Sequence, residues 1–391
     1  MRIQQQTYSV TPMTPSHIRT LSKSCLLAAI LALPLHASRA ADMPAVVAAM
    51  PSSGLHIDPW KPRLDRTRPI VAVIGENSGT ELVDFVVPYG IVADSGVAEV
   101  VALSTEPGPL RLRPGLRVQT QQTLTSFDDG TPLGADYVIV PAFTEDKVND
   151  PAVLAWLRAQ SAKGATVVSI CDGALAVANA GLFEGHRATG HWATDGRRRS
   201  EHPGTLWVDN VRYVADGNVV SSAGVSAAIP VSLALVEAMG GKDAADRTAA
   251  RLGATGWSNE HDSHQFRIGA EIVLTYVGNR YLHGNTHLVI PVSDGVDDIA
   301  LALTLDAYGR TMRSPTSIQV GSAAGVRSSH GLWLLPANPL VEHPDGELLL
   351  WQGPAFAALD HALDDIRQRY GVRSARYVAL GMEYAPGYSD R

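Results

Sequence analysis

Residues 165–181 read ATVVSICDGALAVANAG and join an apolar run to a stretch of small residues around one cysteine, Cys171. The run before Cys171 is short and rich in β-branched residues, which predicts a buried strand, and the stretch after it predicts a helix that ends at Gly181. A cysteine at a strand-to-helix turn has the nucleophile-elbow arrangement, in which the side chain is held out above the sheet. The alternative is a buried structural cysteine, the more common state of a lone thiol.

The local charges around Cys171 act in opposite directions. The N-terminus of the predicted helix favours the thiolate and lowers the thiol pKa, whereas the carboxylate of Asp172 disfavours the thiolate and raises it. The sequence leaves open which effect dominates. The backbone N–H of Asp172, at the start of the helix, is the natural donor to an oxyanion formed when the sulfur attacks a carbonyl or nitrile-like carbon.

The only other cysteine, Cys25, lies in a segment ordered like a secretory signal peptide. Basic residues precede the short apolar run 26–33, and small residues follow at 38–40. The apolar run is much shorter than the roughly 20 residues of a membrane-spanning helix. We therefore expect residues 1–40 to be removed and the mature protein to be periplasmic or secreted, with Cys171 as its single thiol.

Composition limits the partners that this chain can have. With 391 residues and 45% hydrophobic content, it can bury a large core and is expected to form two domains. The formal net charge is -7 and there is no long basic block, which argues against nucleic acid. No later segment is long and apolar enough to span a membrane after signal removal. A small-molecule substrate or ligand is the expected partner, and homo-oligomerisation stays open.

Strands and helices alternate from Arg68 onward, after an extended lead-in at 41–67 that is rich in Pro, Ser and Gly. This alternation predicts an α/β fold with a mostly parallel sheet covered by helices on both faces. The predicted strands are 70–74, 97–103, 137–140, 165–170 and 219–224, and the predicted helices are 81–92, 151–162 and 227–239.

Four motifs in order resemble the ThiJ/PfpI superfamily, which has the class I glutamine amidotransferase-like, flavodoxin-like fold. The closest likeness is to isocyanide hydratases and to the amino-terminal domains of AraC-type regulators. No helix-turn-helix pattern is visible, so the DNA-binding domain of those regulators is not expected. The motifs are LVDFVVP at 82–88, SICDGA at 169–174, AGLFEGHRATGHW at 180–192 and SSAGVSAAI at 221–229.

The resemblance implies that Cys171 is the nucleophile and that Asp84 is its acid/base partner. A carboxyl next to a thiolate is a like-charge pair, so one member holds a proton and can donate it. The alternative for Asp84 is a solvated helix residue. His191 is a further catalytic candidate as a base for the thiol, although its motif points more to packing or to shaping the pocket.

Three departures from the family pattern bear on activity: Val87 replaces a glycine, Ala142 and Phe143 replace a glycine pair, and Asp172 replaces a threonine. Glycines let backbone N–H groups approach a substrate closely, so Phe143 is expected to block or reshape the pocket. Two functions remain open. The protein either hydrates or hydrolyses a small electrophilic molecule through Cys171, or binds or senses a small ligand at an inactive site.

Neither function requires a cofactor, and no metal site is expected. The histidines of the chain's second half follow no zinc-ligand spacing and have no accompanying cysteine. We expect them to be solvated residues flanking a helix at 266–281. They are His261, His264, His283 and His287.

Residues 286–391 repeat the pattern of the first half, with a strand at 288–292, an acidic loop and an apolar helix at 297–309. We expect a truncated, degenerate copy of the ThiJ/PfpI-like domain 68–245, joined to it by a helical linker at 246–285 and lacking an active site. Its last predicted strand, 376–381, would lead to an elbow at Gly381 to Glu383 without a cysteine. The other predicted elements are strands at 317–320, 332–335 and 347–351 and a helix at 359–370.

Overall fold

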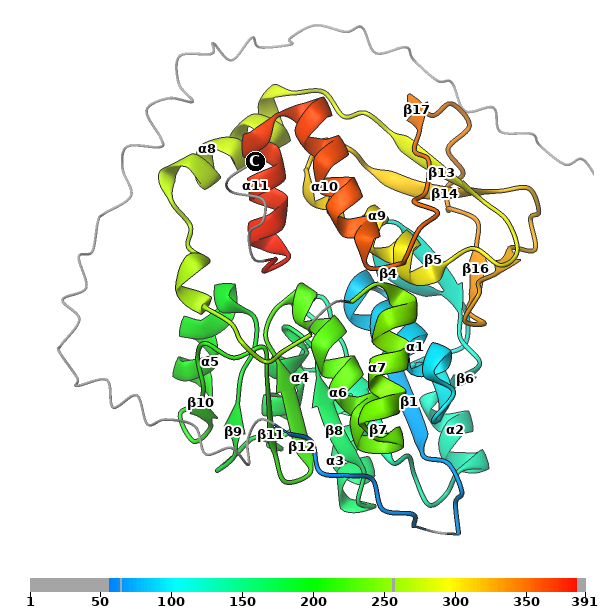
Figure 1. Cartoon of the computed structure of the whole chain (residues 1–391), viewed down its shortest axis with the longest axis vertical. Helices are drawn as coiled ribbons and strands as arrows, with labels where there is room; N and C mark the ends of the chain where they lie inside the picture. The colour runs from blue at the N-terminus through cyan, green and yellow to red at the C-terminus, as the bar shows by residue number, and fades with distance from the viewer. Residues whose placement is uncertain (1–55, 64, 255–256, 385–391) are drawn as a thin grey trace, which may run out of the picture. The chain divides into compact units, whose positions relative to one another are not determined.

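A seven-stranded sheet with the order β11-β12-β8-β7-β1-β3-β6 forms the centre of the computed structural model, which describes residues 56–384 apart from 64 and 255–256 (Figure 1). Every neighbouring pair is parallel except β11 and β12. The strands are β1 (Ile70–Gly75), β3 (Glu99–Ser104), β6 (Gln122–Thr123), β7 (Tyr137–Val140), β8 (Thr166–Ser169), β11 (Tyr213–Asp216) and β12 (Val219–Ser222). The predicted mostly parallel sheet is confirmed.

Helices cover both faces of this sheet, because its strands are apolar on both sides. In β1, Val71 and Val73 belong to one buried cluster with α1 and α6, whereas Ala72 and Ile74 belong to a second with α2, α3 and α4. Successive side chains of a strand point to opposite faces, so an uninterrupted apolar strand needs helices on each. The helices are α1 (Leu82–Ser95), α2 (Leu124–Gly130), α3 (Pro151–Ala162), α4 (Gly173–Asn179), α5 (Asp195–Glu201), α6 (Ala228–Gly240) and α7 (Lys242–Leu252).

The described part of the lead-in is tied to the central sheet. Asp136, at the start of β7, accepts hydrogen bonds from Arg63 and Arg66, both at 2.7 Å. The Trp60 N–H donates to the carbonyl of Ala238 at 2.8 Å. The predicted signal peptide and residues 41–55 lie outside the described residues. Within those that are described, no helix has the length and apolar character needed to cross a membrane.

The C-terminal part forms a three-stranded parallel sheet with the order β14-β13-β17. The predicted final strand at 376–381 is wrong, because Val372–Gly381 is the helix α11. Its buried residues Ser374, Ala375, Val378 and Ala379 recur with helical spacing, which a short apolar run does not reveal from sequence. The elements are α8 (Ala270–Val277), continued by a π-helix (Gly278–Leu282), β13 (Leu288–Val292), α9 (Asp298–Arg310), β14 (Thr316–Val320), β17 (Gly346–Glu347), α10 (Ala357–Tyr370) and α11.

The two halves of the chain share structure. Strand β16 (Trp333–Leu335) pairs antiparallel with β5 (Leu116–Gln119) in a five-stranded sheet that also holds β15 (Val326–Arg327), β4 (Leu110–Arg113) and β2 (Thr80–Glu81). Helix α9 packs on α1 so closely that a Cβ on Gly90 would lie 2.6 Å from Cγ1 of Ile299. The sequence did not reveal this link, which brings the end of α9 to the first domain.

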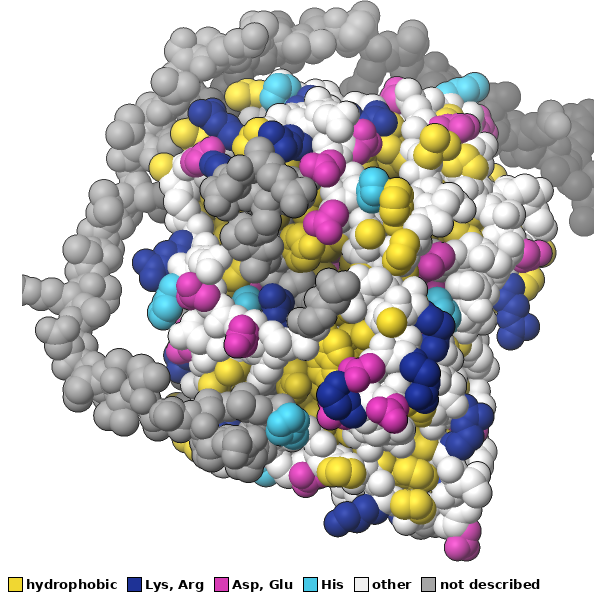
Figure 2. All heavy atoms as spheres, in the orientation of Figure 1, with side chains coloured by type: hydrophobic (Ala, Val, Ile, Leu, Met, Phe, Trp, Pro, Cys, Tyr) yellow, Lys and Arg dark blue, Asp and Glu magenta, His cyan; other side chains and the backbone are white. Residues whose placement is uncertain are grey.

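Acidic and basic side chains are interspersed over the face of the molecule in Figure 2, with hydrophobic side chains scattered between them. Mixed charge of this kind gives no extended field of one sign on that face.

Candidate active site

Cys171 occupies the predicted strand-to-helix turn, between β8 and the start of α4. Its φ is 55°, a left-handed conformation that is uncommon for residues other than glycine and is found at functional sites. Gly173 makes the turn possible, because a Cβ there would lie 2.0 Å from the carbonyl oxygen of Val140. The Cys171 side chain is 5% exposed.

A cavity of about 300 Å³ lies over Cys171. Phe143 and Val225 contribute apolar wall, so Phe143 shapes the space above the sulfur without filling it. The far wall comes from the C-terminal part of the chain, where Asp306, Arg310 and Met312 line the cavity. The predicted lobe without an active site therefore supplies part of the surface around the first domain's cysteine.

Asp84 lies in the first turn of α1 and is completely buried, so it is not a solvated helix residue. Its Oδ2 accepts a hydrogen bond from the Ala142 N–H at 3.1 Å, and its Oδ1 has no partner among the described residues. Burial, followed by the nearby Glu81 carboxylate, raises the pKa of Asp84 well above its ordinary value. The raised pKa and the unpartnered Oδ1 both favour the neutral carboxyl over the carboxylate.

Burial also raises the pKa of the Cys171 thiol well above its ordinary value; Asp84, once it ionises at higher pH, and the carboxylates of Asp172 and Glu81 act in the same direction. Arg310 acts in the opposite direction. Burial, which the sequence did not reveal, is the largest of these effects and favours the protonated thiol. Cys171 rests in its protonated form.

This protonation state predicts the pH dependence of alkylation. In a Cys25→Ser chain, the iodoacetamide rate should reach half its maximum at a higher pH in the folded protein than in urea, where a free thiol has a pKa of about 8.5. The midpoint moves to higher pH because the thiol pKa is raised: the folded protein keeps its thiol proton up to a higher pH than the unfolded chain does. Rates followed by intact mass across neutral and alkaline pH test this, and a folded-state midpoint below the urea value would contradict it.

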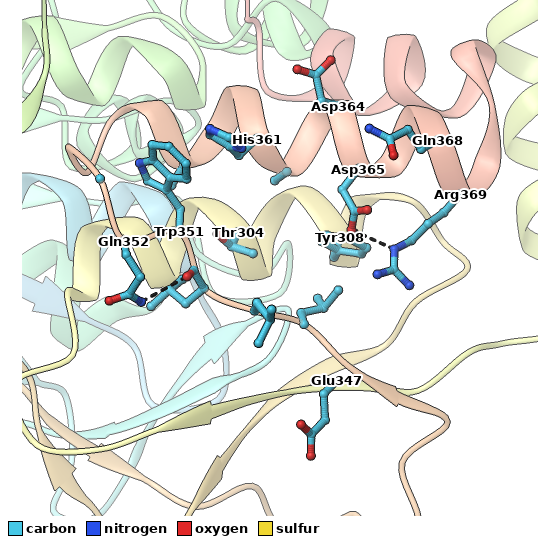
Figure 3. Close-up of a pocket in the computed structure, with 16 residues that line it drawn as sticks. Thr304, Tyr308, Glu347, Trp351, Gln352, His361, Asp364, Asp365, Gln368 and Arg369 are labelled. Carbon is cyan, nitrogen blue, oxygen red and sulfur yellow. Dashed lines mark hydrogen bonds and ion pairs between the residues drawn. The ribbon is translucent and has the colours of Figure 1, made fainter.

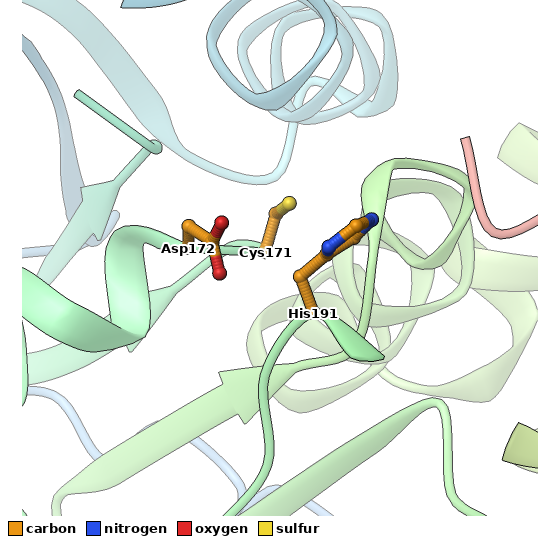
Figure 4. Close-up of side chains that lie close together, drawn as sticks. All are labelled: Cys171, Asp172 and His191. Carbon is orange, nitrogen blue, oxygen red and sulfur yellow. The ribbon is translucent and has the colours of Figure 1, made fainter. Parts of the chain in front are cut away.

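Cys171, Asp172 and His191 lie together, with one ligand-type atom of each within 4.8 Å of the others (Figure 4). The Asp172 carboxylate accepts a 2.5 Å hydrogen bond from the Thr194 hydroxyl. Its backbone N–H makes no hydrogen bond with the described residues, so it can still donate to a substrate. The three candidates from the sequence thus lie close together, and their catalytic roles stay predictions.

Both ring nitrogens of His191 are engaged. Nδ1 accepts the Ala193 N–H and Nε2 donates to the Gly381 carbonyl, each at 3.3 Å. This pattern fixes the neutral tautomer with the proton on Nε2. A base for Cys171 or a metal ligand would need one of these bonds to be given up, so His191 is better suited to shaping the cavity wall.

Sequence reasoning missed three charged residues beside Cys171. Arg310 donates to Glu81 at 2.8 Å and to Asp306 at 2.7 Å, and all three line the cavity. Burial, opposed by Arg310, raises the pKa of Asp306 to about 7. The i,i+4 spacing of Asp306 and Arg310 was a visible signal for their pairing, but nothing in the sequence linked them to Glu81.

Glu383 was also missed as part of this region. Its Oε2 accepts the Gly224 N–H at 2.6 Å, and its Oε1 is 2.6 Å from Nε2 of His261. The His261 side chain is 1% exposed, so the expectation that this histidine is solvated is wrong. The pair fixes the end of α11 against the loop after β12, next to His191.

A larger cavity lies elsewhere, between α9, α10 and residues 347–353, and has a volume of about 830 Å³ (Figure 3). Trp351 stacks on His361 at 3.5 Å between ring centroids, and Asp365 pairs with Arg369 at 2.7 Å. The Tyr308 hydroxyl also donates to Asp365, so three of the lining polar groups form one cluster. The smaller cavity at Cys171 holds the reactive chemistry.

A search for similar proteins agrees with this assignment. The model of the DJ-1/PfpI family matches residues 70–238. The isonitrile hydratase of Pseudomonas putida is 30% identical over 171 residues, which cover 43% of this chain and 72% of that protein. The chain therefore belongs to the DJ-1/PfpI family, as its motifs indicated.

Two further proteins are similar to part of this chain. The HTH-type transcriptional regulator CdhR of Pseudomonas aeruginosa is 31% identical over 134 residues, which cover 34% of this chain and 38% of the regulator. The structure of DJ-1 from Toxoplasma gondii matches with a TM-score of 0.42 and 23% identity, covering 48% of this chain and all of that one. Helices α8 to α11 lie beyond the residues that the family model matches.

Proposed function

We propose that this protein hydrates or hydrolyses a small electrophilic molecule through Cys171. The observation that carries the proposal is the elbow cysteine facing a cavity with a neutral, buried carboxyl, Asp84, beside it. A volume of about 300 Å³ is at the lower end of the usual range for ligand sites, which favours a small substrate. By its similarity to an isonitrile hydratase, an isocyanide is the first substrate to test.

A resting thiol suits the hydration of an isocyanide, R–N≡C. The sulfur bonds to the terminal carbon while a proton is delivered to that carbon, giving the thioimidate Cys171–S–CH=N–R. The thiol proton is the one that ends on carbon, and Asp84, which lies near the thiol without lining the cavity, is the proposed carrier that takes it from sulfur and returns it. Water then adds to the carbon, the C–S bond breaks, and the formamide HC(O)–NH–R leaves with the thiol restored.

The test is product formation from isopropyl isocyanide, followed as N-isopropylformamide by proton NMR, with p-nitrophenyl acetate to assay hydrolysis. We expect catalytic turnover of at least one of the two. The absence of turnover on both, combined with saturable binding of the isocyanide, would favour the alternative function of ligand binding or sensing. The raised thiol pKa and the 5% exposure of Cys171 are what keep that alternative open.

Asp84→Asn separates proton transfer from thiol chemistry. Loss of a general acid/base lowers kcat by roughly 100- to 10,000-fold, whereas replacing a neutral carboxyl by an amide leaves the charge near Cys171 unchanged. We therefore expect turnover to fall by that amount and iodoacetamide alkylation to stay close to wild type. Asp129→Asn, the same change on the exposed side of α2, is the control. Faster alkylation of Asp84→Asn at neutral pH would show that Asp84 is ionised.

Export and assembly are part of the proposal. The basic, apolar and small-residue order of residues 1–40 supports removal of a signal peptide and a periplasmic or secreted location. A single thiol in such a compartment, protonated and only 5% exposed, is shielded from indiscriminate oxidation. Homo-oligomerisation stays compatible with this arrangement.

A further inference from the structure

Arg310 comes from the end of α9, 229 positions after its partner Glu81, and beyond the residues that the family model matches. Its Nη2 donates to Oε1 of Glu81 and its Nε donates to Oδ2 of Asp306. The Asp306 side chain is 3% exposed, and the Glu81 side chain is 11% exposed. A guanidinium placed between two largely buried carboxylates compensates their charge in a region of low dielectric.

Glu81 connects Arg310 to the catalytic helix. Its second oxygen, Oε2, accepts the backbone N–H of Asp84 at 2.6 Å and thereby caps α1. Glu81 also lines the cavity together with Cys171. The Glu81 carboxylate thus binds both Arg310 and the backbone of Asp84. It also forms part of the wall of the cavity above the thiol.

The position of Arg310 is held by close packing. A Cβ on the neighbouring Gly309 would lie 2.2 Å from Cγ of Pro114, so α9 approaches the turn between β4 and β5 as closely as backbone allows. Arg310 also donates to the Gly381 carbonyl at 3.2 Å, the same oxygen that accepts from His191. The guanidinium is therefore fixed by three elements.

We infer that Arg310 is a positioning residue of the Cys171 site, supplied by the C-terminal part of the chain, whose guanidinium compensates the charge of Glu81 beside the thiol. The inference deepens the proposed function. Only the expected effect of Arg310 on turnover rests on that function, because the effect on the thiol pKa can be measured without a substrate. Without Arg310, Glu81 is an uncompensated negative charge near the sulfur, and the thiolate becomes harder to form. Asp306, whose pKa burial raises to about 7, loses the same partner and adds to this negative charge at the alkaline pH where the thiol titrates.

Every other charged or titratable group near the thiol remains in place when Arg310 is replaced. Asp172 and His191 flank Cys171, Asp84 lies behind it, and Arg113 lines the outer cavity wall. Arg198 and Glu383 face the same region from α5 and from the end of α11. Arg198 is 3% exposed and hydrogen-bonded to the His191 carbonyl, so it cannot move to replace Arg310.

The test is the pH midpoint of iodoacetamide alkylation in the Cys25→Ser chain. An opposite charge within a few ångströms shifts a pKa by roughly one unit or more, so Arg310→Gln should raise the midpoint by about one pH unit. Arg310→Lys keeps the positive charge, so its alkylation midpoint should stay near that of wild type. In the double variant Glu81→Gln with Arg310→Gln, the alkylation midpoint should return toward that of wild type. The introduced amide oxygen can still cap α1, but the uncompensated charge of Glu81 is gone. Arg369→Gln, which breaks an ion pair on α10, should leave the midpoint unchanged.

An unchanged midpoint in folded Arg310→Gln would overturn the inference, as would a double variant shifted as far as the single one. If Arg310→Gln does not fold, Glu81→Gln alone takes its place: it removes the charge that Arg310 compensates, so the alkylation midpoint should fall below that of wild type, and an unchanged midpoint would overturn the inference. Because alkylation needs no turnover, these results stand even if neither isocyanide nor ester is a substrate. If turnover is found, Arg310→Gln should lower kcat more than it changes KM, since Arg310 acts on the nucleophile through Glu81.

Discussion

Cys171→Ala is expected to abolish turnover of whichever electrophile the protein accepts, by roughly a thousand-fold or more, the loss typical when a covalent nucleophile is removed. In the proposed reaction the sulfur forms the bond that activates the carbon toward water. No other described cysteine is present, and no serine or threonine is among the described residues that line the cavity. The remaining carboxyl, Asp84, can move a proton but is buried behind the thiol and is not on the cavity wall.

Cys171→Ser is the matched variant, since it keeps the size and the hydrogen-bonding capacity of the side chain at a φ of 55°. A serine hydroxyl is a weak nucleophile unless a base activates it, and both nitrogens of His191 are already engaged. The serine variant should therefore bind the isocyanide with wild-type affinity by calorimetry but form no formamide. Turnover by the serine variant within about ten-fold of wild type would show that the chemistry does not pass through sulfur.

The elbow and the central sheet were predictable because their signals are local. Buried parallel strands are continuously apolar, and residues 70–74 and 137–140 stand out from their surroundings for that reason. The thiol, its neighbour Asp172 and the motif residue His191 follow from the same segments. The burial of Asp84 was less certain, since a helix residue between apolar neighbours can face solvent or core.

The remaining half of the site was not predictable because it depends on contacts between distant segments. Arg310 and Glu81 are 229 positions apart, and Glu383 reaches Gly224 across 159. The error at 376–381 has a related cause. A short apolar run fits a strand or one face of a helix equally well, and packing against α10, α8 and α9 selected the helix α11.

The contacts between distant segments also change what the family resemblance implies about the cavity at Cys171. The departures at Ala142, Phe143 and Asp172 suggested a blocked or inactive site, yet a cavity remains above Cys171 and the Ala142 N–H binds Asp84. Helix α9, which lies beyond the residues that the family model matches, closes the cavity with Asp306 and Arg310. Any comparison of substrate preference must therefore include the C-terminal part.

Gly173→Ala is expected to disrupt the elbow and the fold around it. An added Cβ would lie 2.0 Å from the carbonyl oxygen of Val140 and 2.9 Å from that of Pro141, both backbone atoms of the adjoining β7 end. Neither can rotate away as a side chain could, so helix α4 must move off the sheet. Overpacking of this kind destabilises by about 3 kcal/mol, and the displaced α4 carries Cys171 away from its cavity.

Urea unfolding measures this effect, with Gly196→Ala in α5 as the control. No atom lies within 4 Å of a Cβ built on Gly196, so alanine there gains helix propensity of up to about 1 kcal/mol and should be neutral or stabilising. Gly173→Ala should lower the urea midpoint and bring the alkylation midpoint toward that of the unfolded thiol, because burial is what raises the thiol pKa. Equal urea midpoints for the two variants would mean that α4 can move without loss of stability. The close approach of α4 to β7 would then not be required to hold Cys171 in place.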